Sequence, residues 1–226
     1  MNWLNDFYND DYAKLLSVNT DPTVIHNLIT DYSLTHNIRT PNSLIDFGCG
    51  YGDIIQGLSD KGYETIGVDA SEYSINKCLD KGLSVIKDDF ANVKLDKKFD
   101  VALSWNTCIG HISRDNDRRF ISNVYQHLDD DGIFILMLAH TEHIINTFKA
   151  DFTHNNINRK SELRDNVLYQ TWIMNNKSFD TQRILYMLPE LYTLLDDFCD
   201  IELYSYDGDV IPFAVDSQKI LLVCRK

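Results

Sequence analysis

The sequence is short of positive charge. Lys and Arg together number 21 against 34 Asp and Glu residues, so the formal net charge is 21 − 34 = −13 over 226 residues. A surface with this bias repels phosphate backbones and anionic lipid, and no cluster of Lys and Arg along the chain offsets it. We therefore expect neither nucleic acid nor a membrane as a partner.

The chain also lacks the cysteine patterns of a disulfide framework or a zinc site. Its five cysteines are odd in number, are scattered and include no CxxC pair: Cys49, Cys78, Cys108, Cys199 and Cys224. This usage fits a reducing compartment and predicts no metal site. Long apolar runs are missing as well, since none reaches the roughly 18 residues of a bilayer span and the first residues do not resemble a signal peptide. We expect a cytoplasmic protein.

Repeats, low-complexity tracts and an obvious interdomain linker are absent too. A chain of 226 residues fits one domain, which can bury about 70% of its unfolded surface. Hydrophobic residues make up 44% and charged residues 24%, an ordinary globular composition. The sequence therefore predicts a single domain.

What the sequence does contain is a glycine-rich turn between a buried strand and a helix. Residues 43–53 read Ser-Leu-Ile-Asp-Phe-Gly-Cys-Gly-Tyr-Gly-Asp, with glycine at alternate positions Gly48, Gly50 and Gly52. Glycine lets the backbone turn sharply and approach a ligand closely, so this order is typical of a nucleotide-binding unit. A second carboxylate, Asp69, ends the next strand, where an acidic residue accepts hydrogen bonds from ribose hydroxyls.

The glycine spacing bears on which nucleotide is bound. Dinucleotide-binding turns follow GxGxxG, which lets the helix amino terminus hold a pyrophosphate. Here the order is Asp-x-Gly-x-Gly-x-Gly, and Asp46 precedes the glycines. An anion at that point suits an amine-bearing or cationic ligand better than a phosphate.

Strands and helices alternate along the first two thirds of the chain. Residues 1–40 contain no glycine and have helical spacing, with Asp21-Pro22 as a helix start. Strands are expected near residues 43–47, 65–69, 83–87, 99–105 and 133–138, with helices between them, capped by Ser71 in one case and starting at Asp115 or Asn116 in another. This alternation predicts a parallel sheet with right-handed crossovers.

The last third breaks this rhythm. Two strands, 167–174 and 181–186, flank a turn and predict an antiparallel hairpin laid over one end of the sheet. Pro189 begins a final helix. Strands near 201–206 and 219–224 are expected to pair antiparallel.

The motifs of residues 40–140 together resemble the class I S-adenosylmethionine-dependent methyltransferases. Residues 44–52 match the family's first motif, and Val-Asp-Ala-Ser at 68–71 is similar to its second. Asp-Asp-Phe at 88–90 and Asp-Asp-Gly at 130–132 depart from the family's Gly-Asp-Ala and Pro-Gly-Gly but keep the acidic residue and the turn glycine.

This resemblance implies an α/β fold, a doubly wound Rossmann-like and mostly parallel seven-stranded sheet with an antiparallel last strand. It further implies one methyltransferase domain, with a helical lid (1–40), a cofactor-binding core (41–140), a small antiparallel substrate cap after the fifth strand (141–188) and a carboxyl-terminal part of the core (189–226).

The resemblance also implies a pocket for S-adenosyl-L-methionine. Asp46 would orient the cofactor amine, and the three glycines would admit its methionine moiety. Asp69 would hold the ribose. The remaining implied contacts are Ala70 beside the adenine, Asp89 and Phe90 at its amino group and ring, Ser104 and Trp105 at the methionine end, and Tyr12 on the amino-terminal lid. For the aromatic residues near Tyr12, helix core is the competing interpretation.

For the methyl acceptor, the loop after the fourth strand is the place to search. His111 is the candidate general base because the unperturbed pKa of histidine lies near working pH, although a surface or hydrogen-bonding role remains open. His140 is a weaker candidate. Asn106, Trp172, Arg183 and Tyr186 are candidate substrate contacts, and Arg183 would suit a carboxylate or phosphonate, unless the alternation of the strand points it outward.

The sequence thus predicts an S-adenosylmethionine-dependent methyltransferase that moves a methyl group to oxygen or nitrogen of a small molecule by in-line displacement. Two alternatives stay open. One is a non-catalytic S-adenosylmethionine-binding partner or sensor. The other is an NAD(P)-dependent oxidoreductase, which the glycine spacing and Asp46 oppose.

Overall fold

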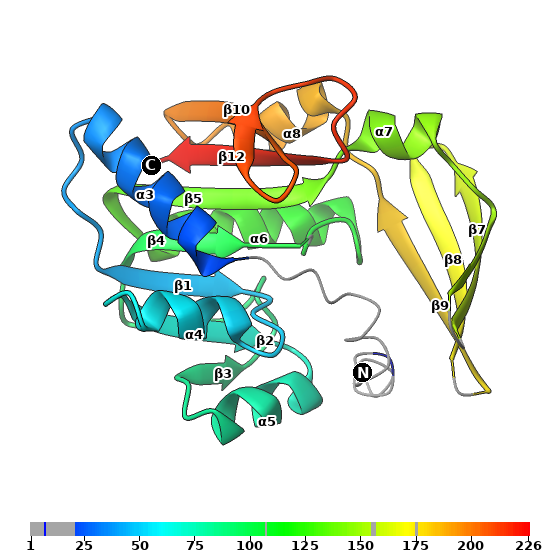
Figure 1. Ribbon diagram of the computed structural model, residues 1–226, viewed down its shortest axis with the longest axis horizontal. Coiled ribbons are helices and arrows are strands. Elements are labelled where there is room, and N and C mark those ends of the chain that lie inside the picture. Colours follow the sequence, from blue (N-terminus) through cyan, green and yellow to red (C-terminus); the bar gives the residue numbers. More distant parts are fainter. Residues whose placement is uncertain (1–6, 8–20, 107, 155–156, 175) are drawn as a thin grey trace.

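The computed structural model describes residues 7, 21–106, 108–154, 157–174 and 176–226. They form an eight-stranded sheet and a separate four-stranded sheet. The smaller sheet stands beyond one end of the larger one, as Figure 1 shows. Tyr12 and about half of the expected amino-terminal lid lie outside the described residues. No helix among the described residues is long and apolar enough to cross a membrane.

The central sheet has the order β11-β10-β12-β5-β4-β1-β2-β3. Neighbours among β1 to β5 pair in parallel, whereas β12 runs antiparallel to both β5 and β10. The strands are β1 (Ser43–Phe47), β2 (Glu64–Asp69), β3 (Val85–Lys87), β4 (Phe99–Ser104), β5 (Leu128–Ala139), β10 (Asp200–Tyr206), β11 (Val210–Pro212) and β12 (Lys219–Arg225). The predicted α/β fold and antiparallel carboxyl-terminal pair are confirmed.

The eighth strand is an addition to the seven expected. β11 is three residues long, ends in proline and pairs with β10 alone, at the edge of the sheet. A segment this short has no alternation to detect, and proline is tolerated at an edge because no ladder hydrogen bond is lost there.

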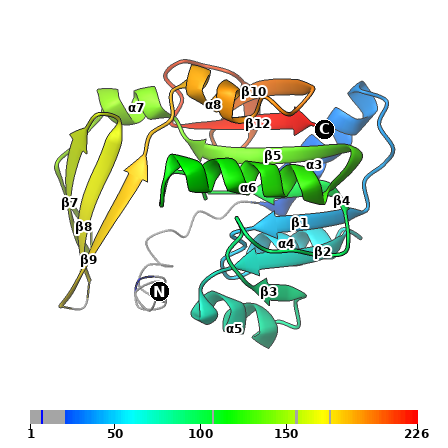
Figure 2. The ribbon, with the colours of Figure 1, turned by 180° about the vertical axis from the view of Figure 1, so that it is seen from behind.

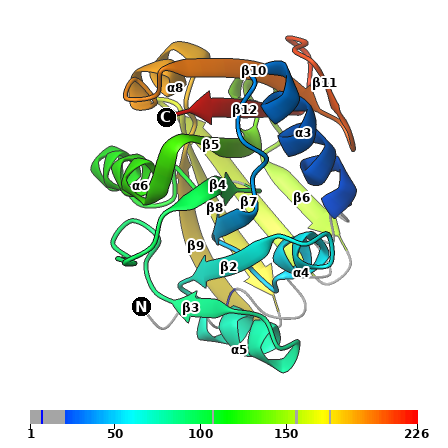
Figure 3. The same cartoon turned by 90° about the vertical axis from the view of Figure 1, so that its left-hand side faces the viewer.

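Helices cover both faces of the sheet. They are α3 (Pro22–Thr35), α4 (Asp53–Ser59), α5 (Glu72–Asp80), α6 (Arg114–His127), α7 (Thr141–Asn146) and α8 (Leu188–Leu194). Figures 1 and 2 show α3 and α4 in front of the sheet and α6 behind it, and Figure 3 shows the sheet edge-on between them. Asp21, Ser71 and Ser113 start three of these helices by accepting a hydrogen bond from a first-turn amide.

The sheet lies between two apolar cores, because successive side chains of each strand point to opposite faces. On one face Leu44, Val101 and Ile133 pack with α3 and α4. On the other face Ile45 and Ala102 join a cluster that includes α6 and α8 side chains. Every residue of β1 and β4 is buried, as in a parallel sheet covered on both sides.

The smaller sheet, which we call the cap, follows α7 and precedes α8. Its strands β6 (Asp151–His154), β7 (Ile157–Arg164), β8 (Val167–Met174) and β9 (Lys177–Ile184) pair antiparallel in that order. The predicted hairpin of two strands was therefore only half of the element. β7 is mostly polar, so it lacks the apolar alternation that reveals a strand. The Asp-Asn pair at 165–166 was the sequence signal for the β7–β8 turn, since these residue types tolerate the positive φ that both adopt there.

Candidate active site

The glycine loop joins β1 to α4 at the carboxyl end of the sheet. Gly48 has φ +81°, and a Cβ there would lie 2.3 Å from Sγ of Cys108, so both conformation and packing require glycine. Gly50, with φ +54°, also adopts the left-handed conformation, but a Cβ there would meet nothing within 4 Å. The loop is thus packed against the protein at Gly48 and open at Gly50, where a ligand can approach its backbone.

Asp46 lies under this loop with an unsatisfied carboxylate. Its side chain is 1% exposed, and Oδ1 has no hydrogen-bond partner among the residues that the structure describes. Burial raises the pKa of this carboxyl to about 7, and the charge of Asp69 contributes. A buried carboxylate without a partner is costly, and a ligand ammonium group supplies both the donor and the charge that it lacks. The residue therefore fits the amine end of the implied cofactor.

Asp69 fastens the loop to the end of β2. One oxygen accepts the Gly50 amide at 2.9 Å and the other accepts the Ser71 amide at 2.8 Å. Burial raises the pKa of Asp69, and these two hydrogen bonds oppose that rise. A carboxylate has about four acceptor positions, so two remain for ribose hydroxyls. Ala70 follows directly, at the place implied for the adenine.

Asp89 and Phe90 follow β3, and their contacts are mostly internal. The Asp89 oxygens accept hydrogen bonds from the Ala91 amide (2.9 Å) and from Nδ2 of Asn92 (2.7 Å), which closes a tight turn. Phe90 packs edge-to-face on Phe120. A ligand group at Asp89 would have to share oxygens that already hold the turn.

The residues that end β4 differ in environment. Ser104 is fully buried, and Trp105 is 3% exposed and packs edge-to-face on Tyr206 in the core that faces α3. Asn106 is exposed and has φ +65°. These contacts give Trp105 a packing role and leave Asn106 on the surface.

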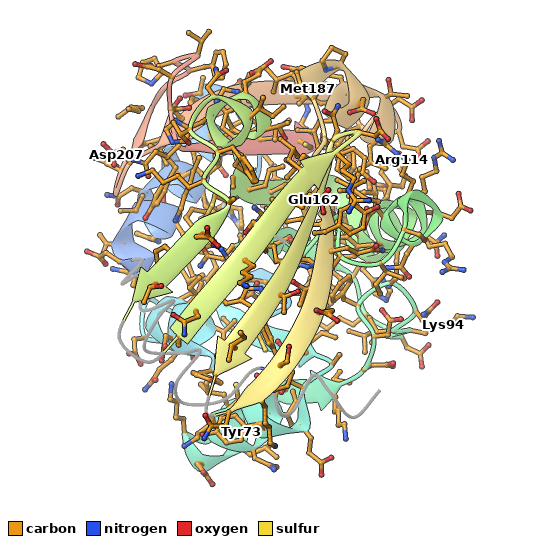
Figure 4. All side chains as sticks on the ribbon, turned by 90° about the vertical axis from the view of Figure 1, so that its right-hand side faces the viewer. Tyr73, Lys94, Arg114, Glu162, Met187 and Asp207 are labelled. Atoms are coloured by element: carbon orange, nitrogen blue, oxygen red, sulfur yellow. The ribbon has the colours of Figure 1, made fainter. Side chains whose placement is uncertain are left out.

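A pocket of about 380 Å³, which we call the cap pocket, lies between the cap and the loops that follow β4 and β5. It brings together three predicted residues, His111, Trp172 and Arg183. Phe7 also lines it and packs edge-to-face on Trp172 and Phe179. Figure 4 looks at the cap from the side away from the central sheet, where Glu162 lies.

Tyr186, the fourth predicted substrate contact besides Asn106, Trp172 and Arg183, does not line this pocket. Its side chain is 4% exposed, and its hydroxyl donates to Oδ2 of Asp117 at 2.6 Å. The same oxygen accepts the Gly110 amide at 2.9 Å. Burial raises the pKa of Asp117, and the hydrogen bonds from Tyr186 and Gly110 oppose the rise. Tyr186 and Asp117 together hold the loop that carries His111.

Asp117 was not among the predicted site residues, although the sequence contains a signal for it. It is the fourth residue of α6 and lies one turn before Phe120 and Ile121 on the buried side of the helix. An acid at an inward position of an amphipathic helix indicates a specific partner. His140, the weaker base candidate, is 1% exposed and is held between the Ser217 carbonyl (3.0 Å) and Glu142 (2.5 Å), away from the pocket lining.

Comparison with solved structures defines the class of fold. An S-adenosylmethionine-dependent methyltransferase from Clostridium acetobutylicum superposes with a TM-score of 0.77 at 18% identity, over 99% of both chains. The CcbJ methyltransferase from Streptomyces caelestis superposes with a TM-score of 0.76 at 16% identity, over 98% of this chain and 95% of that one. The chain therefore has the class I methyltransferase fold.

Sequence comparison then gives the family. A family model described as a methyltransferase domain matches residues 22–191, and the chain belongs to this family. A ubiquinone biosynthesis O-methyltransferase of Rickettsia canadensis is 26% identical over 141 residues, 60% of this chain and 57% of that protein. A cypemycin N-terminal methyltransferase of Streptomyces is 27% identical over 107 residues, 45% of this chain and 44% of that protein. The chain spans about half the length of the curated relatives that it matches.

Proposed function

We propose that the protein is an S-adenosylmethionine-dependent methyltransferase that acts on oxygen or nitrogen of a small molecule. One observation carries the proposal: the buried carboxylate of Asp46 near the end of β1, whose Oδ1 has no partner in the described part of the chain, beside a glycine loop that Asp69 holds in place. A phosphate at this position would meet two carboxylates, whereas an ammonium group would be stabilised by them.

A small acceptor is supported by the pocket and by the relatives. A volume of about 380 Å³ falls within the usual range of roughly 300–1,000 Å³ for small-molecule sites. The similar proteins include the two Rickettsia enzymes named as ubiquinone biosynthesis O-methyltransferases and, among solved structures, the sugar N-methyltransferase KedS8. The net charge of −13 speaks against a nucleic-acid acceptor.

The residues of the chain would mainly align the acceptor. When bound, the cofactor supplies a methyl group on a sulfonium, which is already an excellent leaving group, so proximity and orientation account for most of the catalysis. We assign the general base to His111, which faces the cap pocket. Asp117 and Tyr186 would keep the loop of His111 in place through the Gly110 amide.

Cofactor binding tests the proposal directly. Isothermal titration should show binding of S-adenosylhomocysteine and none of NADH. Tight NADH binding without S-adenosylhomocysteine binding would instead support the dinucleotide-dependent oxidoreductase.

Methyl transfer separates an enzyme from a non-catalytic sensor. The protein should transfer radiolabelled methyl from S-adenosylmethionine to a component of a small-molecule extract, and a sensor would bind the cofactor without doing so. His111→Ala should lower turnover by about 100-fold or more while leaving S-adenosylhomocysteine affinity unchanged. Unchanged turnover would remove His111 from the mechanism.

The domain boundaries and the location of the protein belong to the same proposal. We assign residues 141–188 to a substrate cap within a single domain and a cytoplasmic location. The location is supported by five free cysteines, three of which are buried, with no CxxC pattern.

A further inference from the structure

The lining of the cap pocket differs in charge from the rest of the chain. Among the described residues that line it, the ionisable ones are His111, Lys149, Arg159 and Arg183, and none is acidic. The whole sequence carries 34 acidic against 21 basic residues. A pocket whose described lining carries basic and no acidic side chains favours an anion and disfavours cations.

Arg159 is held so that its guanidinium faces the pocket. On β7 it lies directly opposite Phe152 of β6 and Trp172 of β8. Its guanidinium carbon lies 4.9 Å from the centroid of the Phe152 ring and 5.2 Å from that of Trp172. Two aromatic rings fix the position of the charge without using its N–H donors.

Arg159 has a hydrogen-bond donor without an acceptor in the described part of the chain. Its Nε is buried without a hydrogen-bond partner, and no described carboxylate pairs with it. Burial alone accounts for a lowered pKa of this guanidinium. Arg164, five residues along the same strand, is 64% exposed and is paired with Glu162. Desolvating a charge without a partner is costly, so the arrangement at Arg159 favours a bound anion, which the described residues do not supply.

We propose that Arg159 is the anchor for an anionic group, a carboxylate or a phosphate, on an acceptor with an aromatic or otherwise apolar body. This inference rests on the proposed methyltransferase function and names the substrate class of the same site. The apolar body would lie against Phe7, Phe148 and Trp172, and the guanidinium would bind the anion through its planar fork of donors.

The register places this anchor away from His111. Arg183, whose Cγ would lie 3.3 Å from a Cβ at Gly110, is next to the loop of His111. Arg159 is in register with Trp172 and Phe179, four residues along β9 from Arg183, or about 13 Å of strand. The acceptor should therefore carry its anionic group at one end and the atom to be methylated at the other.

Matched pairs of probes test the charge requirement. The pairs are indole-3-acetate with indole-3-acetamide and 4-hydroxyphenylacetate with 4-hydroxyphenylacetamide, and phenyl phosphate is added as the phosphate probe. Binding to the full chain, saturated with S-adenosylhomocysteine, is measured by ligand-detected NMR and titration at low and at physiological salt. We expect at least one anion to bind about tenfold or more tightly than its neutral amide.

Two variants of Arg159 test whether this residue causes the preference for the anion over its amide. Arg159→Gln should abolish the preference for the anion, and Arg159→Lys should retain part of it because the charge stays and the fork is lost. Arg164→Gln, on the same strand but outside the pocket lining, should leave the preference unchanged. No binding of any anion, equal binding of acid and amide, or an Arg159→Gln protein that still prefers the anion would overturn the proposal.

The result is separable from the proposed function. If the anions bind with the expected preference in the absence of S-adenosylhomocysteine but that nucleoside does not bind, the methyltransferase proposal fails while the anion site stands. If S-adenosylhomocysteine binds and the anion preference is absent, the methyltransferase proposal stands and the substrate class is wrong.

Discussion

Among single residues, Asp46 has the strongest consequence for the site, because its carboxylate is buried and its Oδ1 accepts no hydrogen bond from the described residues. Since the pKa of Asp46 is raised to about 7, above the roughly 3.9 of an unfolded aspartate, its ionisation destabilises the free protein. That penalty appears as pH rises above about 4 and is complete above about 7. A bound ammonium group would remove it, so folding stability and cofactor affinity are linked at this residue.

This linkage gives a prediction for pH. The affinity for S-adenosylhomocysteine should rise as pH increases through about 7, because the ligand amine binds the ionised carboxylate, and should fall about tenfold per unit below that. Asp46→Asn should remove this dependence and weaken binding. In the free protein at pH 8 the same change should raise the midpoint of thermal unfolding, since a penalty on the order of 1–4 kcal/mol is removed.

Asp53→Asn is the control for this prediction. Asp53 begins α4 beside the same loop, but it is 80% exposed and pairs with Lys81. Its replacement should change neither the pH dependence nor the unfolding midpoint measurably. A pH-independent affinity in the unaltered protein would show that Asp46 does not meet the amine.

Gly110 is the second residue with a large expected effect. It has φ +89°, and a Cβ there would lie 2.5 Å from the Ile184 carbonyl oxygen of β9. Gly110→Ala should lower the free energy of unfolding and should reduce methyl transfer more than cofactor affinity, because the cap is pushed from the loop of His111. Gly208→Ala is matched to it: φ is +81° and a Cβ would meet nothing within 4 Å, so only the backbone strain of about 1–2 kcal/mol remains. Equal effects of both changes would contradict the cap contact.

Among the elements, those with a local signal could be predicted, and those defined by distant contacts could not. The β1 strand, the glycine loop and α4 follow from apolar spacing and backbone requirements, so the places of Asp46 and Asp69 at the ends of their strands could be predicted. β7 was missed because its side chains are polar, and it becomes a strand only by pairing with β6 and β8. Arg159 was missed with it. The bond of Tyr186 to Asp117, 69 residues earlier, could not be predicted because nothing local in the sequence reveals it.

The link between α6 and the end of the cap can be tested through Asp117. Asp117→Ala leaves the Gly110 amide and the Tyr186 hydroxyl without their acceptor in the core, which should cost roughly 2–4 kcal/mol of unfolding free energy. Tyr186→Phe should cost about 1 kcal/mol. Both changes should lower turnover while the affinity for S-adenosylhomocysteine stays the same, as measured by titration.

Asp115→Ala serves as the reference on the same helix. Asp115 is 87% exposed and pairs only loosely with Arg118, at 3.5 Å. Its loss should stay within about 0.5 kcal/mol. If Asp117→Ala lowered the free energy of unfolding no more than Asp115→Ala does, the proposed role of Asp117 in holding the His111 loop would be wrong.

Considered as a whole, the molecule consists of a thoroughly buried central sheet and a cap with sparser connections to it. β1 and β4 are buried along their whole length, whereas β7, after its buried first residue Ile157, alternates exposed and half-buried residues. Among the described residues, the Ile184 amide donates to the Gly110 carbonyl at 2.8 Å, and Thr141 Oγ1 donates to the Tyr186 carbonyl at 2.7 Å. Local opening is easiest where buried apolar contacts are few.

Hydrogen exchange should reveal this difference. Amides of β1, β4, β5 and β12 should exchange slowest, at rates set by global unfolding, and those of β7 should exchange faster. Adding S-adenosylhomocysteine should slow exchange at residues 48–52, and adding a bound anion should slow it in β7 and β8. Uniform exchange across both sheets would contradict a separately opening cap.

The cap is also a single insertion. The chain leaves the central sheet at Ala139 and is back beside it at Leu188, so none of the strands that carry Asp46 or Asp69 is interrupted. Within this insertion, changes to the cap strands β6 to β9 leave the strands that carry Asp46 and Asp69 uninterrupted, whereas Tyr186 is tied to α6 through Asp117. In such a layout, the cap strands can change to fit a different acceptor while the strands that hold the cofactor keep their arrangement.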